Sequence, residues 1–316
     1  RSTLSSSSAA SDVYKRQTLT ATITPTPIPS VVDLRDQVTY VHQHERWNYC
    51  GPANLTMALN FLGWTGNRDD VAKAIKPGES NPKLDFIQRG KADKNVMPYE
   101  MVDFVNDKTE YSMLYRYGGE MDLLKNLIAN GFPVVIEKGY YERDYSGKVA
   151  WMGHYLFVTG YDESEGVFIV QDAYLEPGED LRVPYEEFND GWRSFNYLFM
   201  VAYPPESEQT VLFLLGNWSD PTWANRHALD IANREIGTET GIDEFFAWFN
   251  KGTSHVQLFE YVDAAFAYDY AFILYAEIGE PNEAETVETQ RPYRIMWYQT
   301  CLLYTSPSPR DRTRSR

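Results

Sequence analysis

A chain of 316 residues is long enough for two domains, and its 15% of aromatic residues can fill sizeable cores. Its net charge of −16 repels phosphate backbones, which makes nucleic acid a poor partner. No run of 18 or more apolar residues is present, so the sequence predicts no membrane-spanning helix.

Both ends of the chain resemble translated sequencing adaptor rather than protein. The first end contains AASDVYKRQ and the last contains CLLYTSPSPRD. We therefore leave residues 1–17 and 301–316 out of the fold prediction, and we expect the native termini to be missing. Without these ends the chain is still more acidic and Cys50 is its only cysteine. An internal disulfide is then impossible.

Residues 18–29 read TLTATITPTPIP. Alternating Thr and Pro cannot bury a core and favours an extended chain. We predict that residues 1–30 are a disordered tail and linker. Such spacers often follow a signal or anchor, which favours an extracellular or cell-surface bacterial protein.

The sequence WNYCGPANLTMALNFLGW predicts a helix that begins at Cys50 and ends before Gly63. Its apolar residues follow the spacing of one helical face: Leu55, Ala58, Leu59 and Leu62. At the helix N-terminus the dipole stabilises a thiolate, so Cys50 is a candidate nucleophile. Taken alone, Cys50 is better explained as a small apolar core residue than as a nucleophile.

The remainder of residues 31–204 predicts one α+β domain, with helices first and a mostly antiparallel sheet after them. Further helices are expected at residues 69–75, 98–105 and 120–130. Strands are expected at residues 110–117, 132–138, 154–161, 166–174 and 196–203.

Two of these strands carry His154 and Asp172 and are joined by a short turn. If Gly160 pairs with Gly166, His154 lies directly opposite Asp172 on the same face of the hairpin. This pairing predicts an imidazole beside a carboxylate. Each residue alone has an ordinary structural explanation, but together with Cys50 they favour nucleophilic catalysis.

Gln43 precedes Cys50 by a short segment, and its amide could stabilise an oxyanion during acyl transfer. Surface glutamines are common, so this signal is weak on its own. The chain has only five histidines and no second native cysteine, which argues against a zinc site. We predict no metal and no cofactor.

The order of Gln43, Cys50-Gly-Pro, Gly-His154-Tyr and Gln-Asp172 resembles the papain-like cysteine peptidases of the C39 group, in its freestanding branch. That group includes the bacteriocin leader-processing peptidases. The resemblance covers about residues 31–204. It implies that Cys50 is the nucleophile, His154 the base, Asp172 its orienting residue and Gln43 part of the oxyanion hole. The gap between Gln43 and Cys50 is one residue longer than the usual pattern.

Residues 205–300 predict a second, all-helical domain. The segment 248–271 resembles a tetratricopeptide repeat at seven positions: Trp248, Gly252, Leu258, Tyr261, Ala264, Tyr268 and Ala271. Single repeats cannot bury their faces, so we expect the array to be truncated or to dock on the first domain. A generic helical extension is the alternative.

The sequence thus predicts a cysteine peptidase that acts on a peptide or protein substrate, with helical repeats that hold a peptide or protein partner. Two alternatives stay open. The same residues could catalyse another acyl transfer, such as deamidation or transamidation, or the domain could be an inactive binding module.

Overall fold

The computed structural model describes residues 28–46, 48–76, 83, 96–143 and 149–279. The predictions for residues 1–27 and 280–316 lie outside this part of the chain. The α+β prediction is confirmed, because helices pack on a sheet whose strand pairs are all antiparallel. None of the helices in the described part of the chain is both long and apolar enough to cross a membrane.

The strands form one 7-stranded sheet in the order β2-β7-β3-β4-β5-β6, with β1 paired to β4. The strands are β1 (Val31–Asp33), β2 (Ser112–Arg116), β3 (Val134–Arg143), β4 (Val149–Asp162), β5 (Val167–Gln171), β6 (Leu181–Pro184) and β7 (Phe199–Tyr203). The helices are α1 (Cys50–Phe61), α2 (Arg68–Ile75), α4 (Pro98–Lys108), α5 (Met121–Ala129), α6 (Tyr185–Arg193), α7 (Glu208–Leu215), α8 (Pro221–Ile236), α9 (Ile242–Gln257) and α10 (Tyr261–Glu277).

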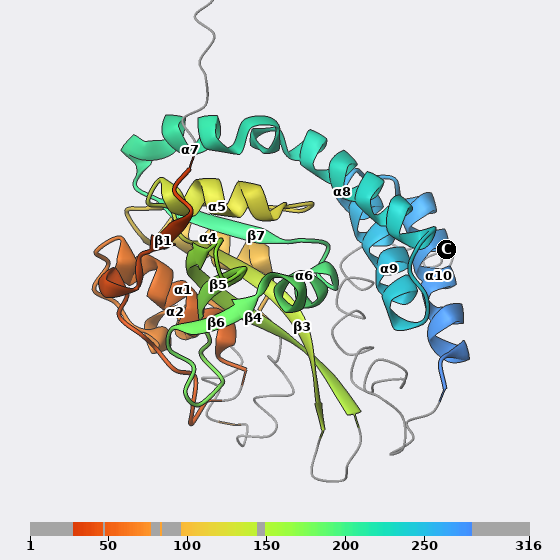
Figure 1. Cartoon of the computed structure of the whole chain (residues 1–316), viewed down its shortest axis with the longest axis horizontal. Coiled ribbons are helices and arrows are strands. Elements are labelled where there is room, and N and C mark those ends of the chain that lie inside the picture. Colours follow the sequence, from red (N-terminus) through yellow and green to blue (C-terminus); the bar gives the residue numbers. More distant parts are fainter. Residues whose placement is uncertain (1–27, 47, 77–82, 84–95, 144–148, 280–316) are drawn as a thin grey trace, which may run out of the picture.

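The two faces of the sheet bury two separate cores. Along β3, Val135 belongs to the core shared with α1, α2 and α4, while Val134 and Ile136 belong to the core shared with α5, α6 and α7. This alternation follows from the two-residue period of a strand. Figure 1 shows α5 and α7 together on one side of the sheet, with α1 and α2 at the opposite end of the molecule from α8, α9 and α10.

Helix α1 is buried on all sides rather than on one face. All residues from Gly51 to Leu59 are buried, including the polar Asn54 and Thr56. Cys50 at the start of the helix, Asn60 and Phe61 at its end, and Leu62 after it are partly exposed. The predicted ends are confirmed, since the helix begins at Cys50 and Gly63 takes a φ of +102° just after it. The prediction of a one-sided apolar face was too narrow, because α1 is the central helix of its core.

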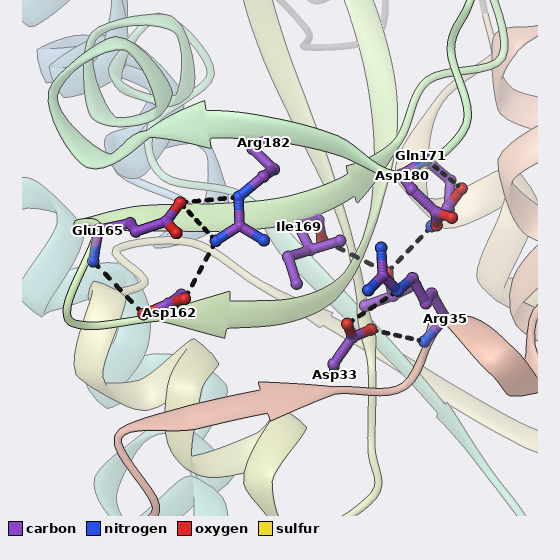
Figure 2. Close-up of polar contacts among 9 residues, drawn as sticks. Asp33, Arg35, Asp162, Glu165, Ile169, Gln171, Asp180 and Arg182 are labelled. Atoms are coloured by element: carbon purple, nitrogen blue, oxygen red, sulfur yellow. Dashed lines mark hydrogen bonds and ion pairs between the residues drawn. The ribbon is translucent and has the colours of Figure 1, made fainter.

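The predicted register of the β4–β5 hairpin is wrong. Gly160 pairs with Ile169 rather than with Gly166, and Asp162 pairs with Val167. The carboxylate of Asp162 accepts hydrogen bonds from the main-chain N–H groups of Ser164 (3.0 Å) and Glu165 (3.3 Å). Gly166 therefore belongs to the turn, where it takes a φ of +66°. Figure 2 shows Arg182 of β6 bound to Asp162 and Glu165 beside this turn.

An irregularity in β4 keeps His154 on its predicted face of the sheet. The longer turn alone would have moved it to the opposite face. The pairing shifts between Gly160, which faces Ile169, and Val158, which faces Val170, so that Thr159 is an extra residue in β4. Beyond Thr159 the register differs from the predicted one by two residues. An even difference keeps every side chain on its predicted face, whereas an odd one would move it to the other face. His154 and Asp172 therefore share a face despite the wrong register.

The first part of the chain also contains elements that the sequence analysis missed: β1, β6 and α6. In α6 the two buried residues are Phe188 and Trp192, which lie four residues apart on one side of the helix. Trp192 packs on Tyr197 in the core below α5. The residues between Phe188 and Trp192 are Asn-Asp-Gly, which are poor helix formers, so the sequence does not predict this helix.

The C-terminal helices α8, α9 and α10 dock on the first part of the chain. Phe246 of α9 contacts Trp151 of β4, with ring centroids 5.3 Å apart. The side chain of Asn196 donates a hydrogen bond to Ser254 of α9 (2.9 Å), and that of Asn250 donates to the carbonyl of Arg193 (2.8 Å). The apolar core of the α1 face therefore continues without a break into α9 and α10.

We predict that Gly252→Leu lowers the thermal unfolding midpoint and destabilises the α9–α10 pair by about 1–3 kcal/mol. A Cβ at Gly252 would lie 2.5 Å from the ring of Tyr268, which is 2% exposed and bonded to Thr253. Thermal unfolding followed by circular dichroism measures the change. Gly237→Ala is the control, because its Cβ would meet only ordinary contacts. Equal midpoints for both variants would contradict close packing at Gly252.

Candidate active site

Cys50 is the first residue of α1 and is partly exposed. The residue before the helix, Tyr49, makes no capping hydrogen bond with its side chain. The main chain of Gly51 and of Tyr155 helps to lower the pKa of the Cys50 thiol. The N-terminus of a buried helix therefore directs its free amides and its dipole at the thiol, as a thiolate requires.

Asn54 joins the first turn of α1 to strand β4. Its side-chain amide donates to the carbonyl of Cys50 (2.9 Å) and to the carbonyl of Tyr155 (2.8 Å). Tyr155 follows His154 directly in β4, so one buried amide fixes the main chain of the thiol-bearing residue relative to that of the imidazole-bearing one. Asparagine is an unfavourable residue inside a helix, and nothing in the sequence pattern identified this role.

His154 lies between Cys50 and Asp172. Its Nε2 atom is 2.7 Å from Asp172 Oδ1, and both side chains are buried. The Cys50 thiol also acts on this ring, since it helps to raise the pKa of His154, and Nδ1 is the ring nitrogen that Asp172 leaves for it. The contact with Asp172 is diagonal, because the ladder of β5 ends at Gln171 and Asp172 follows it. The structure thus brings the three predicted residues together, with a hydrogen bond between His154 and Asp172 and a mutual influence of Cys50 and His154 on their pKa values.

Burial and charge act in opposite directions on the thiol and the imidazole. Burial alone would raise the pKa of Cys50, but the hydrogen bond and charge of His154 outweigh it and lower that pKa. Burial would also lower the pKa of His154, but the charge and hydrogen bond of Asp172, together with Cys50, raise it to about 10. These two shifts favour a thiolate–imidazolium pair.

The carboxylate of Asp172 is held in its ionised form. Burial would raise its pKa, but the charge and hydrogen bond of His154 and two main-chain donors lower it. The donors are the N–H groups of Tyr174 (2.8 Å) and Leu175 (3.2 Å), both of which bond Oδ1. The carboxylate therefore faces only hydrogen-bond donors in these contacts, which suits it to orient and stabilise an imidazolium.

Gln43 lies next to Asp172 through its main chain. Its N–H donates to the carbonyl of Ala173 (2.7 Å), and the hydroxyl of nearby Tyr40 donates to the carbonyl of Asp172 (2.7 Å). His44 Nε2 is 2.7 Å from the carbonyl of Tyr174. The segment before Cys50 is therefore aligned along the segment that follows Asp172. This alignment places the main chain of Gln43 beside Ala173, the residue after Asp172.

Within the described part of the chain, no group of three or more His, Cys, Asp or Glu side chains could hold a metal ion. A thiolate, an imidazolium and a carboxylate in one line can form and break a thioester.

The sequence profile of the Peptidase_C39 like family matches residues 35–200, which is more than half of the chain. Among solved structures, the chain is similar to a protein from Bacillus anthracis that is named as C39-like. The identity is 18% over 55% of this chain and 97% of that one, with a TM-score of 0.42.

The chain is also similar to Xylellain, a cysteine protease from Xylella fastidiosa, at 19% identity over 56% of this chain and 86% of that one, with a TM-score of 0.38. A further similarity is to the peptidase domain of Streptococcus ComA, a bi-functional ABC transporter, at 15% identity over 52% of this chain and 99% of that one, with a TM-score of 0.36. No curated protein sequence matches the chain.

We predict that iodoacetamide alkylates Cys50 well below the pH at which an ordinary thiol of pKa near 8.5 reacts. The reason is the lowered pKa of Cys50, which rests on the positive charge of His154. In His154→Ala the lowering effect of the imidazole is lost and burial still raises the pKa of Cys50. The pH midpoint of Cys50 alkylation should therefore rise above the wild-type value. The alkylation rate is measured from pH 5 to 10 at the Cys50 peptide by mass spectrometry. A wild-type midpoint at pH 8–9 would contradict the thiolate–imidazolium pair.

We also predict that Asn54→Leu destabilises the fold by about 1–3 kcal/mol, because the carbonyls of Cys50 and Tyr155 lose the side-chain amide that joins them. The same variant should slow alkylation of Cys50 near pH 6, since the spacing of Cys50 and His154 is no longer fixed. Thr56→Val is the matched control, because Thr56 bonds only within α1, to the carbonyl of Pro52 (2.8 Å). If both variants change stability alone, Asn54 has no influence on the thiol.

Proposed function

Because the chain belongs to the Peptidase_C39 like family, we propose that it is a cysteine peptidase that hydrolyses peptide bonds with Cys50, His154 and Asp172. The observation that carries this proposal is the 2.7 Å hydrogen bond between His154 Nε2 and Asp172 Oδ1, beside a Cys50 thiol whose pKa His154 lowers. The directions of the pKa shifts support it, because they favour the reactive ionisation state of both members of the pair.

In the first half of the proposed reaction, the Cys50 thiolate attacks the carbonyl carbon of the substrate. A C–S bond forms and the electron pair of the carbonyl moves to its oxygen. When the C–N bond breaks, imidazolium Nδ1 of His154 gives its proton to the departing amine. The products are a thioester on Cys50 and a free amine.

In the second half, water attacks the thioester and the now neutral His154 accepts its proton. The C–S bond breaks, the carboxylic acid leaves, and the thiolate–imidazolium pair is restored. Asp172 stays ionised throughout. It stabilises the imidazolium and fixes the ring so that Nδ1 faces the sulfur.

We assign the oxyanion hole to the Cys50 main-chain N–H and the side-chain amide of Gln43. The hydrogen bond from Gln43 N–H to Ala173 supports this assignment, because it anchors Gln43 beside the Asp172 segment. A donor at this position is worth about 10²- to 10³-fold in kcat in comparable acyl-transfer sites.

The proposal includes the helical pair α9 and α10 as a tetratricopeptide-like unit that holds a peptide or protein partner. Close packing supports it. Gly252 lies directly against the Tyr268 ring, and Ala264 and Ala271 are buried in the same core.

The proposed activity is tested with a peptide that carries a thiol-reactive electrophile and with a library of unmodified peptides. We expect the electrophile to modify Cys50 and the library to yield new amino termini. Cys50→Ala should abolish both results. Gln43→Ala should lower kcat by about 10²-fold or more, whereas the exposed Gln37→Ala is the control that should not.

The products separate the proposed hydrolysis from its alternatives. Ammonia release without chain cleavage would indicate deamidation, and incorporation of an added amine would indicate transamidation. Absence of both labelling and cleavage in the wild-type chain would contradict the enzyme and favour a binding module.

A further inference from the structure

The buried amide of Gln171 makes three hydrogen bonds at the end of β5. Its Nε2 donates to Thr159 Oγ1 (3.1 Å) and to Asp180 Oδ1 (2.7 Å), and its Oε1 accepts from the main-chain N–H of Asp180 (3.0 Å). The side chain is 0% exposed. Figure 2 shows the side chains of Gln171 and Asp180 next to each other at the end of β5. Every donor and acceptor of the amide thus has a protein partner.

These bonds connect two features on which the site depends. Thr159 is the extra residue of β4, which sets the face on which His154 lies. Asp180 closes the loop 172–180, which begins with Asp172. A single side chain therefore links the strand that carries the imidazole with the loop that carries the carboxylate.

Strand pairing does not hold this loop, since β5 ends at Gln171 and β6 begins at Leu181. Within the loop, Asp172 N–H donates to the carbonyl of Gly178 (2.7 Å). Asp180 takes a φ of +55°, a conformation that is uncommon outside glycine and costs free energy unless contacts stabilise it. The two bonds between Gln171 and Asp180 hold the end of the loop next to Leu181, the first residue of β6 that pairs with β5.

We propose that Gln171 is a positioning residue, which holds the Asp172 carboxylate against His154 by joining the loop 172–180 to the extra residue of β4, Thr159. This inference rests on the proposed function of the Asp172–His154–Cys50 line. The position requires a neutral amide, because only an amide offers two donors and one acceptor in this arrangement. A carboxylate at the same position would face the carboxylate of Asp180.

The test is the pH profile of Cys50 alkylation by iodoacetamide in the full chain, followed at the Cys50 peptide. Asp172→Asn defines the profile without the orienting charge. Gln171→Glu should raise the pH midpoint toward that reference by about one unit, which slows alkylation about tenfold near pH 6. Gln209→Glu, on the exposed side of α7, adds the same charge far from the loop and should leave the profile unchanged.

A second substitution tests the contact itself. Asp180→Asn keeps an acceptor for the Gln171 amide and should shift the midpoint less than Gln171→Glu. The double variant Gln171→Glu with Asp180→Asn exchanges the donor and the acceptor, because the introduced amide can donate to the introduced carboxylate. Its midpoint should return toward that of Asp180→Asn alone.

Thr159→Val removes one of the three bonds and should give a smaller upward shift, which keeps the test available if Gln171→Glu does not fold.

The outcomes separate this inference from the proposed function. If Asp172→Asn shifts the midpoint and Gln171→Glu lowers only the thermal stability, the positioning role is overturned and the proposed triad stands. If Asp172→Asn itself leaves the profile unchanged, both are overturned. Failure of the double variant to recover would also overturn the proposed contact.

Discussion

The opposition between burial and charge at Cys50 and His154 determines the form of this site. Burial disfavours both the thiolate and the imidazolium, and it is the Asp172 carboxylate that reverses this preference at the imidazole. The carboxylate must therefore stay ionised and close to the ring. The main-chain donors of the loop 172–180 and the diagonal contact across the hairpin serve this single requirement.

The architecture supplies each member from a different element. Helix α1 lies inside one core and presents Cys50 at its first position. His154 lies in the part of β4 that is no longer paired with β5. Asn54 connects the two elements close to the reacting groups. On the far side of the site, Trp151 of the same strand packs on Phe195 and on Phe246 of α9. The strand that bears the imidazole is thus held from both ends.

Much of this arrangement was predictable from local sequence. The Gly-Pro pair after Cys50 and the glycine at position 63 mark the ends of α1, because each suits a specific helix terminus. The hairpin register was not predictable, since Thr159 has no property that distinguishes an extra residue from a paired one. The prediction that His154 meets Asp172 held only because the remaining error was even. The roles of Asn54 and Gln171 were missed because their partners are main-chain groups or distant residues, which no sequence period reveals.

The commitment of His154 Nε2 to Asp172 has a consequence for the order of events in the proposed reaction. Only Nδ1 is left to exchange protons with anything bound at the sulfur. The departing amine and the incoming water must then use the same nitrogen in succession and occupy the same small volume beside it. The first product has to leave before hydrolysis begins, so the lifetime of the thioester is governed by exchange at one position. An amine that returned there faster than water would re-form the original bond.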